Sequence, residues 1–69
     1  MRTYLVNLRS QRNESQQDVA DALGISRQYY AMIESGERQK RMDIVLLSAI
    51  AKHFEVPVYE IVAHEQRAE

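Results

Sequence analysis

Hydrophobic residues recur at intervals of three and four along most of this chain, which is the spacing of one face of an α-helix. They form five short groups: Tyr4, Leu5 and Leu8; Val19, Ala20 and Leu23; Tyr30 and Ile33; Ile44, Leu47, Ile50, Ala51 and Phe54; Val58, Ile61 and Val62. Strict alternation of apolar and polar residues, typical of a half-buried strand, does not occur. The pattern predicts an all-α domain, a compact bundle of about five short helices.

Helix ends are most clearly marked around the second and third groups. Ser15 is a suitable N-cap, and Asp18 stands three residues later, like the acid of a capping box. Gly24 suits the left-handed residue that ends a helix, and Ser26 can cap the next one, which Gly36 ends. Because the connection is so short, the two helices must cross steeply, which is the helix-turn-helix arrangement, predicted for residues 16–35.

Three further helices are expected around this pair. The first should span Thr3–Asn13, and the next should be capped by Asp43 and end at Phe54. The last should begin at Pro57, because proline is tolerated at a first helical position. We expect one domain over residues 1–64 and a frayed C-terminal tail over residues 65–69.

Three apolar residues fall on the outer faces of the last two predicted helices. These are Val45, Ala49 and Tyr59. Charged residues would be expected at such positions, so we interpret the three as a candidate dimer surface. Single exposed apolar residues are also normal on a monomer, and that interpretation stays open.

The segment around the predicted turn carries a recognisable combination of residues. It contains Gln16, Ala20, Gly24, Ile25, Tyr30, Ile33, Glu34 and Gly36, in the pattern Q-x3-A-x3-G-I-x4-[IVY]-x2-I-E-x-G. Leu8-Arg9 precedes the glutamine by seven residues, and the run VPVYEIV at residues 56–62 resembles GVSLDELL. Over nearly the whole chain this resembles the Cro/phage-repressor (XRE) family of helix-turn-helix regulators. The resemblance implies a lambda-repressor-like DNA-binding domain.

The second helix of the pair carries the candidate base contacts. Tyr30 and Ile33 should face inward, which leaves Arg27, Gln28 and Met32 outward. Arginine can pair with guanine and glutamine with adenine in the major groove, and an apolar side chain can contact a thymine methyl. By resemblance, the family's base-contacting positions fall on these three outward residues.

Contacts to the DNA backbone are expected nearby. Gln16 and Gln17 open a helix, whose free N–H groups suit a phosphate oxygen; in the resembling family the residue at Gln16 also braces the base-reading side chains. Ser26 and Tyr29 are expected to touch phosphate or sugar. A basic cluster beyond the helix could flank them, formed by Arg38, Lys40 and Arg41. An ordinary polar helix start and a solvated loop are the simpler interpretations.

Charge is segregated along the chain although its formal net value is only −1. Met1–Asn13 contains three arginines and no acid, Glu14–Ile25 contains three acids and no base, Ser26–Arg41 sums to +2 and Met42–Glu69 to −3. One basic face is therefore compatible with DNA binding, with strong sensitivity to salt.

Arg9 lies at the edge of the first group of apolar residues, and a charged side chain so close to the core needs a partner. By resemblance, it forms a partly buried ion pair with Glu34, and the guanidinium fork suits a carboxylate. We expect this pair to be structural rather than catalytic.

Several classes of function are disfavoured. The 69 residues leave no room for a second domain or a sizeable pocket, and cysteine is absent. His53 and His64 lack the spacing of a metal motif, so no metal, cofactor or enzymatic activity is expected. Without a long apolar run, we expect no membrane association and a cytoplasmic location.

The sequence therefore predicts a sequence-specific regulator of transcription, a repressor that binds double-stranded DNA as a homodimer on an inverted repeat. The alternative is a helix-turn-helix module that binds protein, such as an antitoxin subunit or a partner of another regulator. The acidic C-terminal half favours that alternative.

Overall fold

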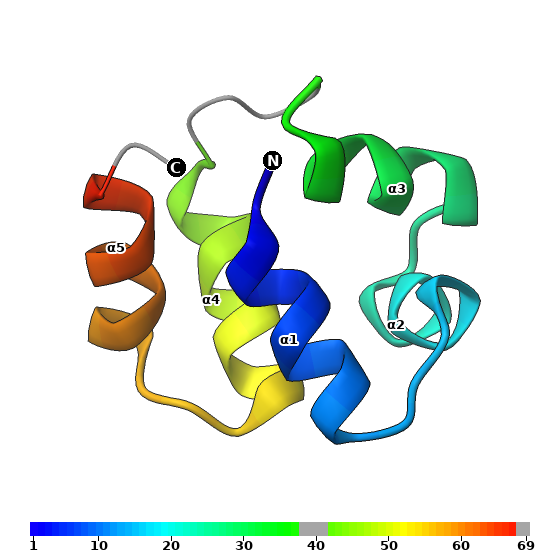
Figure 1. Ribbon diagram of the computed structural model, residues 1–69, viewed down its shortest axis with the longest axis horizontal. Helices are drawn as coiled ribbons and strands as arrows, with labels where there is room; N and C mark the ends of the chain where they lie inside the picture. Colours follow the sequence, from blue (N-terminus) through cyan, green and yellow to red (C-terminus); the bar gives the residue numbers. More distant parts are fainter. Residues whose placement is uncertain (38–41, 68–69) are drawn as a thin grey trace.

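The computed structural model describes residues 1–37 and 42–67. Within these residues it contains five helices: α1 (Thr3–Gln11), α2 (Gln16–Leu23), α3 (Arg27–Ser35), α4 (Ile44–Phe54) and α5 (Val58–Gln66). α4 and α5 lie side by side and run in opposite directions, while α2 and α3 form the other side of the molecule (Figure 1). In that view α3 lies across the page and α2 is seen almost end-on, so the two cross steeply. The all-helical, lambda-repressor-like prediction is confirmed.

Side-chain caps begin three of the helices. The Ser15 hydroxyl accepts the Asp18 N–H at 3.0 Å while the Asp18 carboxylate accepts the Ser15 N–H at 2.9 Å, a complete capping box. Ser26 accepts from the third residue of α3 at 3.0 Å, and Asp43 does the same for α4 at 2.8 Å. Gly24 ends α2 with φ of 72°, a left-handed conformation in which glycine has no steric penalty. The predicted caps around the turn are confirmed.

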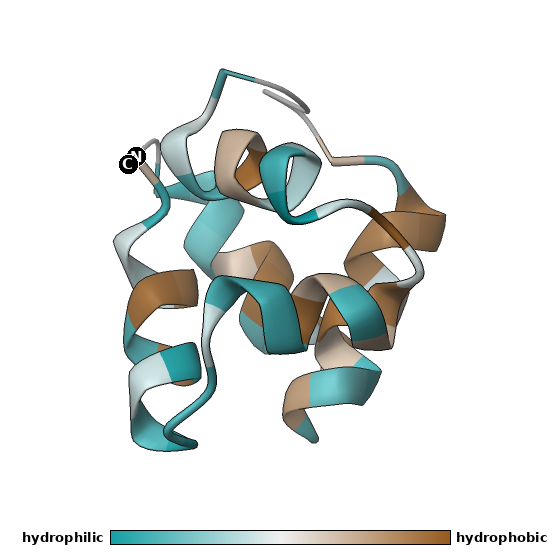
Figure 2. Ribbon diagram, turned by 90° about the vertical axis from the view of Figure 1, so that its right-hand side faces the viewer, coloured by the Kyte–Doolittle hydropathy of each residue, from teal (hydrophilic) through white to brown (hydrophobic). Residues whose placement is uncertain are grey.

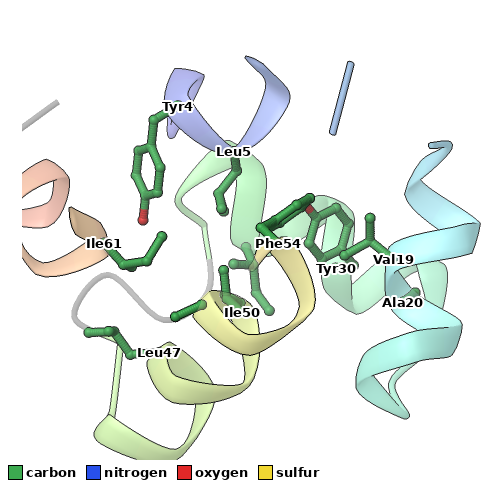
Figure 3. Close-up of a cluster of buried hydrophobic side chains, with 11 residues drawn as sticks. Tyr4, Leu5, Val19, Ala20, Tyr30, Leu47, Ile50, Phe54 and Ile61 are labelled. Carbon is green, nitrogen blue, oxygen red and sulfur yellow. The ribbon is translucent and has the colours of Figure 1, made fainter. Parts of the chain in front are cut away.

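Apolar side chains from all five helices meet in one core (Figure 3). The buried set is Tyr4, Leu5, Val19, Ala20, Tyr30, Ile33, Leu47, Ile50, Ala51, Phe54 and Ile61. Removing each large member from water contributes about 1.5–3 kcal/mol to the free energy of folding. The inner faces of α2 and α3 are packed into this core.

Two predicted core residues are exposed. Ile44 is 67% exposed and Val58 is 39% exposed. Each is the first residue of its helix and lies at the edge of the apolar face that packs on the core. The centre of that face is Ile50 in α4 and Ile61 in α5, both fully buried. The apolar spacing was therefore correct, but the extent of the inward face was overestimated by one residue at the start of both helices.

Helix ends also differ from the prediction. α1 ends at Gln11 rather than Asn13, because Asn13 has a φ of 55° that a right-handed helix cannot contain. Pro57 is the N-cap of α5 and not its first helical residue. The helix then continues to Gln66, and Glu65 forms an ion pair with Arg2, so residues 65 and 66 belong to α5; residues 68–69 of the expected tail lie outside the described residues.

Candidate nucleic-acid interface

The first two residues of α3, Arg27 and Gln28, project from the surface and are exposed. Tyr30 and Ile33 on the opposite side are fully buried, so the helix is held by its inner face. Figure 2 looks onto α2 and α3 and shows hydrophilic residues at the start of both helices. Two polar helix starts therefore lie on the same side of the molecule.

A chain of hydrogen bonds connects the interior to this surface. Arg9 Nε donates to Glu34 Oε2 at 2.8 Å, and its Nη2 donates to Oε1 at 3.3 Å. Gln16 Nε2 donates to the same Oε1 at 3.1 Å, and Gln16 Oε1 accepts from Arg27 Nη1 at 3.5 Å. The ion pair thus orients Gln16, and Gln16 in turn lies against the exposed Arg27.

The surroundings of the ion pair favour the charged forms of both Arg9 and Glu34. Burial has the largest single effect on Glu34 and raises its pKa, but hydrogen bonds from Arg9 and Gln16, with Tyr30 nearby, together hold that pKa below its usual value. The hydrogen bonds that Arg9 donates to the Glu34 carboxylate raise the pKa of Arg9.

The hydroxyl of Tyr30 is buried next to this ion pair and makes no hydrogen bond of good geometry within the described residues. Its burial and the Glu34 carboxylate raise the pKa of Tyr30 well above the usual range. The hydroxyl therefore stays protonated, and the site keeps one carboxylate charge opposite one guanidinium.

One flank of α3 is hollowed. Ser26, Gln28, Tyr29 and Met32 line an open depression of about 250 Å³. Met32 and Tyr29 are both half-buried, and Tyr29 also packs against the core. The hollow lies beside Gln28 and has a mixed polar and apolar lining, whereas Arg27 lies beside Gln16.

The predicted backbone contacts have different surroundings. Gln17 is exposed, but its amide donates to Asp21 Oδ1 at 2.7 Å within α2. The Ser26 hydroxyl accepts the Tyr29 N–H as the cap of α3. The predicted basic cluster, Arg38, Lys40 and Arg41, lies outside the described residues.

The three residues predicted to form a dimer surface do not form one patch. Val45 is 76% exposed near the start of α4, and Tyr59 is 73% exposed near the start of α5. Because these helices run in opposite directions, the two positions lie at opposite ends of the pair (Figure 1). Ala49 instead lines an open groove of about 450 Å³ together with Ala22 and Leu23 of α2.

Sequence reasoning missed two interactions that tie distant segments together. Arg2 is 5% exposed and binds Glu65 of α5, and His53 of α4 lies 3.1 Å from Glu14, between α1 and α2. A single charged residue gives no signal of burial when its partner lies 63 positions away. His53 is half-buried beside a carboxylate, and the described residues contain no group of side chains that could hold a metal ion.

A steeply crossed helix pair with a glycine turn, whose second helix exposes its first polar residues, defines a helix-turn-helix domain. A family model described as helix-turn-helix matches residues 5–61. The chain therefore belongs to this family, the Cro/phage-repressor (XRE) type of DNA-binding regulatory domain. The comparisons found no match among curated proteins or solved structures. Among the described residues, no helix has the length and apolar character needed to cross a membrane.

Proposed function

We propose that this protein is a sequence-specific regulator of transcription that binds double-stranded DNA, and that it represses by occluding a promoter. α3 would enter the major groove, and two copies would bind the two halves of an inverted repeat. Half-sites bound by such dimers have centres about 10–10.5 base pairs apart. As a DNA-binding regulator, the protein would act in the cytoplasm.

The observation that carries this proposal is the exposure of Arg27 and Gln28 at the start of a helix whose opposite face is fully buried. Helix-turn-helix domains contact base edges with the early residues of the second helix. Arg27 Nη1 lies 3.5 Å from Gln16 Oε1, and an arginine at this position suits a paired contact with guanine. Met32, beside Gln28 in the hollow, suits a thymine methyl.

The backbone contacts belong to the same proposal. The start of α2 presents Gln16 and Gln17 with free N–H groups, and Ser26 and Tyr29 border the start of α3. These groups would set the register on the duplex without selecting its sequence.

Arg27→Ala and Gln28→Ala are each expected to weaken binding to the preferred site by about 1–3 kcal/mol while leaving binding to random DNA unchanged. The preferred site is first obtained by selecting bound duplexes from a random pool, and affinities are then measured by fluorescence anisotropy. Arg67→Ala and Gln11→Ala are matched controls, because they remove the same side chains from exposed positions away from α3, just after the end of α5 and at the end of α1. Equal losses on all sequences would contradict a role in base recognition, and failure to select any sequence would favour the protein-binding alternative.

The proposed homodimer requires a surface, and Tyr59 offers the best centre for it. Its side chain is 73% exposed and stands next to Val58, which is 39% exposed. Tyrosine is over-represented among the residues that dominate binding energy at interfaces.

Tyr59→Glu is expected to weaken dimerisation by about 2 kcal/mol, because it places a charge where an aromatic ring would be buried. Sedimentation velocity over a concentration series measures the effect. Val45→Glu is the matched variant at the other end of the α4–α5 pair and should leave the dimer intact. If only Val45→Glu dissociates the dimer, the interface lies at the start of α4 instead.

A further inference from the structure

Arg2 is a charged residue with almost no exposed surface, and its polar atoms contact two distant helices. Its Nε and Nη2 donate to the two carboxylate oxygens of Glu65 in α5 at 2.9 and 3.1 Å. Its Nη1 donates to the carbonyl of Ile33 at 2.7 Å, and its backbone N–H donates to the carbonyl of Glu34, also at 2.7 Å. Arg2 therefore connects the last turn of α3 to the last turns of α5.

Tyr4 completes the same connection from the first turns of α1. Its hydroxyl donates to the Glu65 carboxylate, and its ring stacks on His64 with centroids 4.5 Å apart and an interplanar angle of 3°. We call Arg2, Tyr4 and Glu65 the terminal clamp. Both ends of the clamp lie outside residues 5–61, the part of the chain that matches the family.

The clamp adds to the hydrogen bonds at the end of α3, where the Gly36 N–H donates to the carbonyls of Met32 and Ile33 and the Ser35 hydroxyl donates to that of Met32. The last carbonyls of a helix lack partners within it and carry partial negative charge, so a guanidinium there is favourable. The start of α3 is capped by Ser26, and Arg2 supplies a second point of support at its end. A helix held at both ends keeps its direction relative to the bundle.

We propose that the terminal clamp positions α3 for DNA, so that sequence-specific affinity depends on residues that do not touch the duplex. This rests on the proposed function of α3. Paired hydrogen bonds to a base tolerate only small displacements of the donor, whereas attraction to phosphates tolerates larger ones. Loosening the end of α3 should therefore reduce binding to the preferred site and spare binding to random DNA.

Glu65→Gln tests the proposal, with Glu60→Gln as its matched control. Both variants make the same chemical change in α5, but Glu60 is exposed and lies outside the clamp. Affinities for the preferred site and for random duplex are measured at a temperature at which circular dichroism shows all proteins folded. Amide hydrogen exchange of residues 34–36 is followed in the absence of DNA.

We expect Glu65→Gln to lower specific affinity about tenfold or more, to leave affinity for random DNA unchanged and to speed exchange at residues 34–36, while Glu60→Gln changes none of these. Folded Glu65→Gln with wild-type specific affinity would overturn the proposal and leave the clamp a purely structural role. If Glu65→Gln does not fold, Tyr4→Phe removes only one hydroxyl of the clamp and is judged by the same criteria, with a smaller loss expected.

The two proposals fail in different ways. If the wild-type protein itself prefers no sequence, the function proposed for α3 is wrong. In that case unchanged exchange at residues 34–36 in Glu65→Gln overturns the anchoring of α3 as well, and faster exchange supports the anchoring alone.

Discussion

Replacing Glu34 with alanine is expected to lower the free energy of unfolding by about 3–5 kcal/mol, because it leaves the Arg9 guanidinium nearly buried without its counter-charge. The Glu34 side chain is 3% exposed and that of Arg9 is 18% exposed, so water can replace little of what is lost. Domains have roughly 0.05–0.15 kcal/mol of stability per residue, so this change removes a large part of the total. Urea denaturation at low temperature measures it.

A double-mutant cycle separates two costs: that of leaving one charge buried without a partner, and that of losing the ion pair itself. Arg9→Ala should also destabilise strongly, but the Arg9→Ala/Glu34→Ala double variant should lose much less than the sum of the single losses. Gln16→Ala is the neutral comparison, since it removes one uncharged donor to the same carboxylate, and should cost about 0.5–1.5 kcal/mol. Additive losses from Arg9 and Glu34 would contradict the buried ion pair.

The same pair predicts a dependence of stability on pH. The pKa of Glu34 in the folded protein lies below its ordinary value of 4.5, so the stabilisation is fully present above that value and is lost as pH falls through the lower, folded pKa. The urea midpoint of the wild-type protein should therefore fall more steeply than that of Glu34→Gln between about pH 5 and about pH 3. Parallel curves would show that Glu34 does not contribute to acid sensitivity.

Ile50→Ala is expected to destabilise the domain by about 2–5 kcal/mol, because it removes a fully buried side chain from the centre of the core and leaves a cavity. Thermal or urea denaturation followed by circular dichroism measures the loss. DNA binding should be lost only to the extent that the protein unfolds, because Ile50 is fully buried in the core and is not part of the exposed side of α3.

Ile44→Ala is the matched control for this change. It removes the same atoms from the same helix, at a position that is 67% exposed. The expected change is within about 0.5 kcal/mol, as for ordinary surface substitutions. A large loss from Ile44→Ala would mean that the start of α4 is covered, for example by a second copy of the chain.

Local features of the fold were predictable from the sequence because they depend on neighbouring residues. The capping box at Ser15 and Asp18, the left-handed Gly24 and the cap at Ser26 involve groups within a few positions of one another. Apolar spacing of three and four is equally local, and it identified all five helices.

The candidate interface was predictable to the same extent. Burial of Tyr30 and Ile33 leaves Arg27 and Gln28 on the outer face whatever the rest of the chain does, provided that α3 is a helix on a core. The pairing of Arg9 with Glu34 came from family resemblance, because spacing alone does not bring residues of different helices together.

What the sequence by itself determined is therefore the helices, the caps of α2, α3 and α4, and the outward face of α3. Only the tertiary structure decided which polar side chains meet across the fold: Arg2 with Glu65, and His53 with Glu14. It also decided that Val45 and Tyr59 lie at opposite ends of the α4–α5 pair. The physical reason is that helix periodicity and capping act over a few residues, whereas contacts between helices depend on packing angles that no single helix specifies.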